Sequence, residues 1–394
     1  MIPLPTSHTK LFAVPKSIAI RLPMMIKYTN MQAVTISRIG FLILGIVFVS
    51  IFSVAVILFA RGYRPNFQSR QLKPTGILVA TTFPDSAQIY INNILKSVTP
   101  LTTNLAPGNI TIDIKKDGYF PWTKKMLIQP ETVTRISAYM FPSVPSLKAV
   151  TTSGASLPTL SPDGTKIAYI SGTNLYTLDL NESPFGLINR ESQLITTFIS
   201  SPTQLFWSPD SRQVVATVSA ELLDSWAATA KIKEDQKLAT LSPILQTILA
   251  SSAADLVWSP KENKLLYTAT ASAVIPDNLI HQLPGSSTQT QERTLKPKQK
   301  YVYDLEEDRN FAVGNLPWTW FPTSNHLMRI EKQKIYIMEY DGQNSTLVYD
   351  GPMQDNFSIP YPSAKQLLIL TNLNPTQSAA KISPIYNLYA LSLR

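Results

Sequence analysis

The residues from Ile39 to Ala60 form a run of 22 residues without a charged side chain, Asn, Gln or Pro, and this run constrains the chain more than any other feature. As a helix it rises about 1.5 Å per residue and crosses a hydrocarbon core of about 30 Å. Arg38 and Arg61 flank it and can extend their charges to the headgroups. A buried core helix is the alternative, but such helices are rarely so long, so uniformly apolar and basic at both ends. The sequence therefore predicts a transmembrane helix over 39–60, with the lipid bilayer as a partner.

We expect this segment to be a retained anchor and not a cleaved signal peptide. A signal peptide has a shorter apolar stretch with small residues before the cleavage site, whereas this run is long and ends Ile57-Leu58-Phe59-Ala60. Basic residues on its two sides are nearly balanced, and long domains cross membranes largely regardless of such charges. The architecture that follows favours a cytoplasmic N-terminus. The sequence therefore predicts a single-pass protein of the cell membrane with residues 61–394 extracytoplasmic.

The excess of positive charge lies at the N-terminal end of the chain. Nine of the 35 Lys and Arg residues, and no acidic residue, fall within residues 1–75, which leaves 26 basic residues against 26 acidic ones in the rest. A nucleic-acid-binding surface needs clustered positive charge, so we expect no nucleic acid partner. The basic tail, residues 1–38, shows no periodic pattern over residues 1–23. The translation start therefore stays open between four methionines: Met1, Met24, Met25 and Met31.

The residue types that carry common enzyme chemistry are rare in this sequence or wrongly spaced. Cysteine is absent, which excludes disulfides, thiolate metal sites and a cysteine nucleophile. The sequence contains three histidines but no paired-histidine metal motif, and neither a phosphate-cradling glycine loop nor a strand–elbow–serine pattern occurs. We therefore expect no catalytic, cofactor-binding or metal-binding residues, and no cofactor.

Residues 76–141 follow a polar linker, residues 61–75, and alternate between apolar and polar side chains, as strands with one buried face do. The segments that read as strands are 77–82, 87–91, 110–114, 125–128 and 133–139. Asn, Asp, Pro and Gly between them suit the backbone of tight turns. The pattern predicts a small antiparallel β-sandwich.

Five short motifs in this sandwich region resemble those of the PEGA domain, a surface-layer-like bacterial β-module. They keep a family-like spacing and read Pro84-Asp85-Ser86-Ala87, Tyr90-Ile91-Asn92-Asn93, Val98-Thr99-Pro100, Leu105-Ala106-Pro107-Gly108 and Lys116-Asp117-Gly118-Tyr119. Asp85 and Ser86 depart from the Glu and Gly of the tetrapeptide that names the family. The resemblance implies an extracytoplasmic location and a role in display or carbohydrate-proximal binding, and it defines no catalytic residues.

Tyr119, Phe120 and Trp122, around Pro121, are the ligand-binding candidates of the sequence. Flat aromatic faces suit pyranose rings, so these three side chains would form a sugar-stacking platform if they were exposed together. The alternative, which we favour, is packing in the core and at the edge of a small sandwich.

A second pattern recurs from about residue 142 onward. An apolar or Trp-ended strand enters a turn that Pro begins and Asp, Asn or Gly closes, and a second apolar strand follows. The turn prolines are Pro162, Pro209, Pro260, Pro322 and Pro362. A period of about 40–50 residues with short strands in each unit is typical of propeller blades. The repeats predict a β-propeller of about five blades over residues 147–394, which makes the whole chain mainly β.

The repeat resembles that of TolB-type propellers, best in the copies at 160–169 and 206–216. Two insertions interrupt the period. The first, near 221–250, is rich in Ala, Leu and Lys with apolar residues at helical spacing, which predicts one or two helices. The second, near 276–300, is rich in Pro, Gln, Ser and Thr and predicts a solvated loop.

The two ends of the repeat region are expected to meet. Residues 387–394 read as the third strand of a last blade, and no fourth strand follows them. Residues 147–151 read as a strand that lies before the first blade. Pairing of this early strand beside the terminal one would complete the last blade and remove an exposed sheet edge.

Two classes of function follow from these features. The first is a membrane-anchored, non-catalytic binding or scaffolding protein of the bacterial cell envelope, whose partner is an envelope protein or a glycan. The alternative is a hydrolase-like envelope enzyme with a site in the propeller cavity that the sequence does not reveal. Hydrolases that carry such a propeller as a gate add a catalytic domain of a few hundred residues, and we expect none here.

Overall fold

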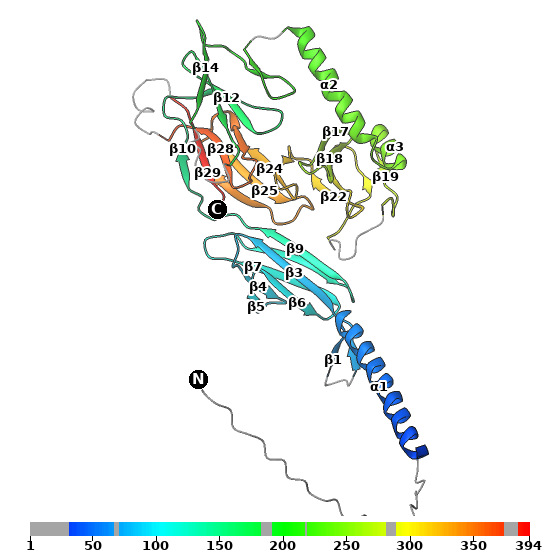
Figure 1. Cartoon of the computed structure of the whole chain (residues 1–394). Helices are drawn as coiled ribbons and strands as arrows, with labels where there is room; N and C mark the ends of the chain where they lie inside the picture. The colour runs from blue at the N-terminus through cyan, green and yellow to red at the C-terminus, as the bar shows by residue number, and fades with distance from the viewer. Residues whose placement is uncertain (1–30, 67–70, 183–190, 217–218, 281–288, 374–384) are drawn as a thin grey trace, which may run out of the picture. The chain divides into compact units, whose positions relative to one another are not determined.

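The computed structural model describes residues 31–66, 71–182, 191–216, 219–280, 289–373 and 385–394 (Figure 1). Most of the basic tail, with three of the four candidate start methionines, lies outside the described residues. The chain divides into two compact units, residues 1–60 and residues 61–394. Strands dominate the second unit, so the chain is mainly β as predicted.

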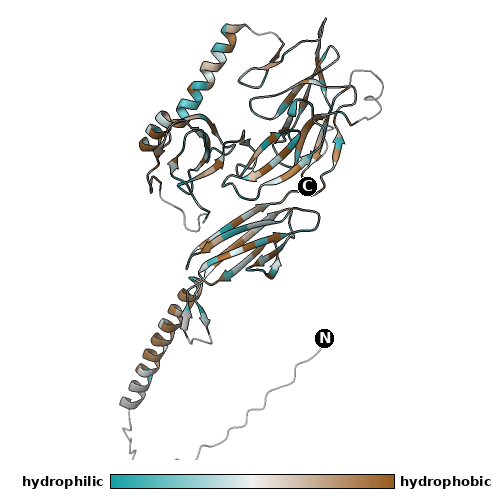
Figure 2. Ribbon diagram, turned by 180° about the vertical axis from the view of Figure 1, so that it is seen from behind, coloured by the Kyte–Doolittle hydropathy of each residue, from teal (hydrophilic) through white to brown (hydrophobic). Residues whose placement is uncertain are grey.

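Helix α1 (Met31–Ala60) contains the apolar run. Its segment Arg38–Ala60, 23 residues long, is the one helix among the described residues that is long and apolar enough to span a membrane. The large apolar side chains of this segment are exposed, and Figure 2 shows hydrophobic residues along most of its described length. A helix that is apolar all round needs an apolar environment. Its length and composition are those of a membrane anchor or a signal sequence.

The linker after the helix is not an open chain. Strands β1 (Arg64–Asn66) and β2 (Gln71–Lys73) pair as a hairpin. At its base the backbone N–H of Thr75 donates to the carbonyl of Gly62 at 3.1 Å. The Tyr63 hydroxyl also donates to Glu131 at 2.8 Å. The described part of the 61–75 segment, which was expected as a polar linker, is therefore a strand pair tied to the β-sandwich.

The β-sandwich consists of two sheets, with strand orders β5-β4-β7-β8 and β6-β3-β9. Its strands are β3 (Gly76–Phe83), β4 (Gln88–Ile91), β5 (Ile94–Val98), β6 (Leu101–Leu105), β7 (Gly108–Lys115), β8 (Trp122–Ile128) and β9 (Val133–Tyr139). The expectation of an antiparallel sandwich is wrong at one pair, because β9 runs parallel to β3. Alternation of side chains reports which face of a strand is buried but not the direction of its neighbour, so the pattern could not show this.

Burial in the sandwich follows the alternation. Ile112 and Ile114 of β7, like Leu78 of β3, are fully buried, and they belong to one apolar core between the two sheets. The hairpin between β4 and β5 turns at Asn92 and Asn93, whose φ angles are 50° and 65°. These left-handed values are the ones that Asn tolerates better than most residues, as the sequence indicated.

The described part of residues 147–394 forms five sheets of propeller type and a small hairpin (Figure 1). The first sheet is β11 (Ser156–Leu160), β12 (Lys166–Ser171), β13 (Asn174–Asp179) and β14 (Gln193–Thr197), and the second is β15 (Phe206–Trp207) and β16 (Val214–Val215). The third is β17 (Ala253–Trp258), β18 (Lys264–Ala269), β21 (Lys300–Asp304) and β22 (Arg309–Gly314), and the hairpin is β19 (Ala273–Val274) and β20 (Thr294–Leu295). The fourth is β23 (Thr319–Trp320), β24 (His326–Glu331), β25 (Lys334–Glu339) and β26 (Thr346–Asp350). The fifth is β27 (Ser358–Pro360), β28 (Gln366–Thr371), β29 (Asn387–Ser392) and β10 (Leu147–Ala149), with a short 3₁₀ helix, η1 (Gln354–Asn356), before it.

The same turn joins the first two strands of each of these sheets. Two backbone hydrogen bonds of 2.8–3.1 Å close it in every described copy, as in Gly164 N–H to Ser161 O and Ser161 N–H to Lys166 O. One residue of each turn has a φ angle between 58° and 71°, namely Gly164, Ser211, Glu262, Ser324 and Ala364. Residues other than Gly and Asn rarely adopt this conformation. The repeated Pro-centred motif therefore marks a repeated backbone structure.

The predicted pairing of the two ends of the repeat region is confirmed. Strand β10 lies antiparallel to β29, with Lys148 opposite Ala390, and the fifth sheet has the order β10-β29-β28-β27. The backbone N–H of Val150 extends the pairing by donating to the carbonyl of Leu388 at 2.8 Å. The last sheet is therefore completed by the strand that precedes the first one.

Apolar clusters join neighbouring sheets face to face. One cluster joins the first sheet to the fifth, a second joins the fifth to the fourth, a third joins the fourth to the third, and a fourth joins the first to the second. The third sheet presents its other face, with Tyr267 and Tyr303, to helix α3 (Pro243–Ser252), which buries Leu245 and Leu249 there. Burial of both faces is what stabilises a propeller sheet.

The first insertion contains the expected helices. Helix α2 (Ala220–Leu238) has no buried residue, whereas α3 is buried along one side. The second insertion differs from the expected solvated loop where it is described. Leu295 of β20 is fully buried, and the Arg293 guanidinium lies 3.3 Å from the buried Asp308 carboxylate. A polar composition did not reveal these anchors, because a single apolar and a single basic residue carry them.

Candidate functional site

The candidate site is the junction between the β-sandwich and the fourth and fifth sheets, all within residues 61–394. The end of the sandwich contributes the rings of Tyr139 and Phe141. They pack edge to face against Phe321 and His326, with ring centroids 5.7–6.5 Å apart. The Tyr139 hydroxyl donates to the carbonyl of Ala364 at 2.6 Å. Such aromatic pairs stabilise beyond their buried area, so packed rings hold one part of the junction.

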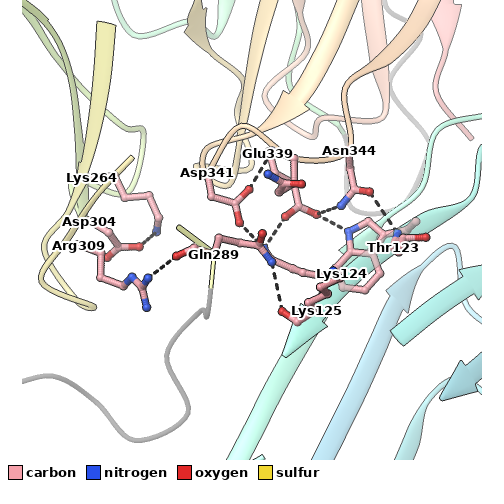
Figure 3. Close-up of polar contacts among 12 residues, drawn as sticks. Thr123, Lys124, Lys125, Lys264, Gln289, Asp304, Arg309, Glu339, Asp341 and Asn344 are labelled. Carbon is pink, nitrogen blue, oxygen red and sulfur yellow. Dashed lines mark hydrogen bonds and ion pairs between the residues drawn. The ribbon is translucent and has the colours of Figure 1, made fainter. Parts of the chain in front are cut away.

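Figure 3 shows a charge network that belongs to the same junction. Lys124 of β8 reaches two carboxylates at the end of β25, and its Nζ lies 2.6 Å from Glu339 Oε2 and 2.7 Å from Asp341 Oδ2. The three side chains are at most 10% exposed. The contact between Lys124 and Asp341 is an ion pair and not a hydrogen bond, because no donor meets Asp341 Oδ2 in hydrogen-bond geometry. The Lys124 ammonium thus forms ion pairs with two buried carboxylates.

Glu339 accepts from three donors. Its Oε2 accepts from Lys124, and its Oε1 accepts from the Trp122 indole N–H and from Asn344 Nδ2, the latter at 3.1 Å. Asn344 Oδ1 accepts in turn from the backbone N–H of Thr123 at 3.1 Å. Three consecutive residues of β8 therefore donate to one propeller sheet. Hydrogen bonds to a buried carboxylate are stronger than neutral ones.

The alternation of β8 explains why Lys124 takes this position. Trp122, Lys124 and Met126 lie on one side of the strand, and the first and last belong to the sandwich core. A lysine between two core positions would be costly in an isolated sandwich, because a buried charge needs a partner. The propeller carboxylates supply that partner. Sequence reasoning missed Lys124 because it placed this strand over 125–128 only. The signal that could have revealed the contact was a lysine at a position of β8 that faces the core.

The network shifts the pKa of each member. Burial alone would lower the pKa of Lys124, but the Glu339 and Asp341 carboxylates outweigh it and raise that pKa. Burial alone would raise the pKa of Glu339, but the Lys124 ammonium holds it below its usual value. For Asp341 burial dominates, so its pKa is raised. The ammonium and the Glu339 carboxylate are therefore the tightly held ion pair of the junction.

His326 lies between the rings and the network and is almost fully buried. Its Nδ1 shares a hydrogen bond of 2.8 Å with Thr323 Oγ1. Burial lowers the pKa of His326 to about 4, although the Glu339 carboxylate opposes this shift. The ring is therefore neutral at pH 7.

The second insertion also reaches strand β8. Gln289 Nε2 donates to the carbonyl of Lys125 at 3.2 Å, and the Gln289 carbonyl accepts from the Arg309 guanidinium (Figure 3). Close to it, Lys264 pairs with Asp304 at 3.4 Å, and both side chains are buried. The sandwich is thus tied directly to the fourth and fifth sheets, and through Gln289 to Arg309 of the third.

The three aromatic candidates from the sequence are placed in different surroundings. Tyr119 packs against the sandwich core, and Trp122 is part of that core with its indole N–H on Glu339. Phe120 packs against the apolar cluster of the fourth and fifth sheets. Packing therefore accounts for all three side chains, and they do not form one exposed platform.

A cavity of about 510 Å³ lies in the propeller between the first, second and fifth sheets. Its polar lining includes Ser156, Thr203, Gln204, Gln354 and Asp355. Asp355 is the one carboxylate among the described lining residues, and Phe206, Phe357 and Tyr386 add aromatic walls. Neutral hydrogen-bonding groups next to aromatic rings suit a polar, uncharged or weakly basic ligand group. Within the described ranges, no group of three or more His, Cys, Asp or Glu residues is arranged to hold a metal ion.

Comparison with known proteins matches one part of the chain to a family. Residues 75–142 match the PEGA domain, in agreement with the motifs in the sequence. A search of curated protein sequences found no match.

Several solved structures with propellers are similar to this chain. A protein from Agrobacterium tumefaciens described as a TolB is 13% identical, with a TM-score of 0.20 over 59% of this chain and 72% of that one. The β-propeller domain of the Trilobed protease from Pyrococcus furiosus is 13% identical, with a TM-score of 0.20 over 72% of this chain and 65% of that one. The acylaminoacyl peptidase of Pyrococcus horikoshii is 10% identical, with a TM-score of 0.18 over 78% of this chain and 37% of that one. These similarities are too distant to assign an activity.

Proposed function

We propose that the chain is a non-catalytic binding or scaffolding protein of the cell envelope, anchored in the cell membrane by α1, with residues 61–394 extracytoplasmic. The junction is the observation that carries this proposal. Lys124, Glu339 and Trp122 join the sandwich to the propeller through buried, charge-assisted contacts, so the propeller is presented as part of one body with the sandwich. A fixed orientation lowers the conformational cost of binding a partner.

The PEGA match and the apolar helix support the location. A membrane-type helix is followed directly by a domain whose family is typically extracytoplasmic. The partner would be an envelope protein or a glycan, and the propeller cavity is where we expect it to bind. That cavity offers hydroxyl and amide groups beside aromatic side chains, which suits sugar hydroxyls or peptide groups.

A pull-down from detergent-solubilised membranes tests the proposal. Thr203 is exposed and lines the cavity, so Thr203→Trp should fill part of it. We expect the wild-type chain to retain a specific envelope component and this variant to retain at least tenfold less. Thr229→Trp on the exposed surface of α2 is the matched control and should retain as much as the wild type. Equal recovery with both variants would count against the cavity, and no retained component at all would count against the binding function.

A further inference from the structure

The tryptophans that end the first strands of the propeller sheets connect neighbouring sheets. Trp207 Nε1 donates to the carbonyl of Thr159 in the first sheet at 2.9 Å. Trp320 Nε1 donates to the carbonyl of Val257 in the third sheet at 2.8 Å. In both cases the acceptor lies two residues before the turn of the preceding sheet. The same two seams have a second hydrogen bond between turns, such as Lys261 N–H to Ser324 Oγ at 2.9 Å.

Trp258 occupies the equivalent position of the third sheet but lacks this bond. It directly precedes the Ser259 turn, as Trp207 precedes the Ser208 turn. Its Nε1 atom is buried and has no hydrogen-bond partner. By the spacing of the other two copies, its acceptor would be the carbonyl of Phe206 in the second sheet. This donor is therefore unsatisfied in the structure, and a buried N–H without a partner is destabilising.

The seam between the second and third sheets also lacks an apolar cluster among the described residues. The second sheet packs Leu205 and Trp207 against the first sheet. The third sheet instead packs against Leu245 and Leu249 of α3. Within the described residues, the first strands of the two sheets, β15 and β17, are therefore joined neither by a tryptophan hydrogen bond nor by an apolar cluster.

We propose that this seam opens and closes, and that a hydrogen bond from Trp258 Nε1 to the Phe206 carbonyl latches its closed form. Closure would give Trp258 the partner that the other two tryptophans have. The helical insertion between β16 and β17 allows the movement, because α2 has no buried residue to hold it in place. Phe206 also lines the propeller cavity, so the movement of β15 would reshape the wall of that cavity.

The absence of cysteine in the sequence allows a distance measurement on the full chain. Spin labels at Arg212→Cys and Lys261→Cys, both exposed, report on the seam. We expect two distance populations, and Trp258→Phe should reduce the ratio of the shorter to the longer population about two- to tenfold, the effect of one hydrogen bond. Trp320→Phe, the same change at a joined seam, should leave that ratio unchanged.

A label pair across the joined first and second sheets, Lys166→Cys and Arg212→Cys, controls for general loosening. It should give one narrow distance with and without Trp258→Phe. A single population for the Arg212–Lys261 pair, or two populations whose ratio Trp258→Phe leaves unchanged, would overturn the proposal. An equal change in the control pair would overturn it as well, because the propeller would then be loosened as a whole.

Discussion

Replacing Lys124 by methionine would leave Glu339 and Asp341 buried without a cation. Removing one partner of a buried ion pair typically costs about 3–5 kcal/mol, because the remaining charge is uncompensated. We expect Lys124→Met to lower the free energy of unfolding of residues 61–394 by about that amount, measured by urea denaturation. Lys96→Met, at an exposed lysine of β5, is the control and should change it by less than about 0.5 kcal/mol.

Neutralising the carboxylates should offset this loss. Adding Glu339→Gln and Asp341→Asn to Lys124→Met removes the uncompensated charges, so the triple variant should be more stable than Lys124→Met alone. A triple variant that is less stable than the single one would show that the loss of packing, and not of charge balance, dominates the effect.

The pKa of His326 predicts how stability depends on pH. The folded pKa of about 4 lies below the value of about 6.5 expected for an unfolded chain, so the unfolded state binds more protons between these values. Stability should therefore fall as the pH drops from about 6.5 to 4, by roughly 3 kcal/mol at most from this group. His326→Phe should remove this part of the dependence in urea melts.

Burial also raises the pKa of the Asp341 carboxyl, so the informative quantity is the difference between the two proteins. Glu339 and Asp341 are present in both and largely cancel. If the free energy of unfolding of the wild type and of His326→Phe changed equally between pH 7 and 4.5, His326 would not be the buried, neutral group described above.

The sequence was enough to predict residues whose role depends on local backbone structure, but not the residues that join the sandwich to the propeller. Asn92 and Asn93 were recognisable because a tight hairpin needs a left-handed backbone, which is a local property. Trp122 and Glu339 are 217 positions apart, and neither has a neighbour in the sequence that marks the contact. For the aromatic residues, composition showed that the rings are present, but only the fold shows which of them are buried.

At the scale of elements, the pairing of β10 with β29 should control the stability of the propeller. Deleting residues 387–394 removes β29, exposes the edges of β28 and β10, and leaves Leu367 and Tyr169 with an open apolar face. We expect this variant to unfold or aggregate, because exposed edges recruit other strands. Replacing residues 281–288 by eight Gly and Ser residues keeps the chain length and should cost far less in a urea melt. Equal stability of the two variants would contradict the closure.

The strand pattern made this closure predictable, whereas the surroundings of the insertions were not. A last sheet without a fourth strand and an unassigned strand before the first sheet leave one economical pairing. The second insertion was expected to be a solvated loop because its composition is polar. Leu295 and Arg293 anchor part of it, and single residues of this kind do not produce a periodic signal.

At the scale of the whole molecule, the proposed extracytoplasmic location of residues 61–394 is tested most directly by cysteine labelling in intact cells. The chain contains no cysteine, so each substitution gives one reporter. Val144 is 86% exposed, and Leu78 is fully buried. Lys27, in the basic tail, reports on the other side of the membrane.

With a maleimide that does not cross membranes, Val144→Cys should react in intact cells to the same extent as in lysed ones. Lys27→Cys should react only after lysis, and Leu78→Cys should not react in the folded protein in either case. Reaction of Val144→Cys only after lysis would place the sandwich and the propeller in the cytoplasm and would contradict the proposed envelope function.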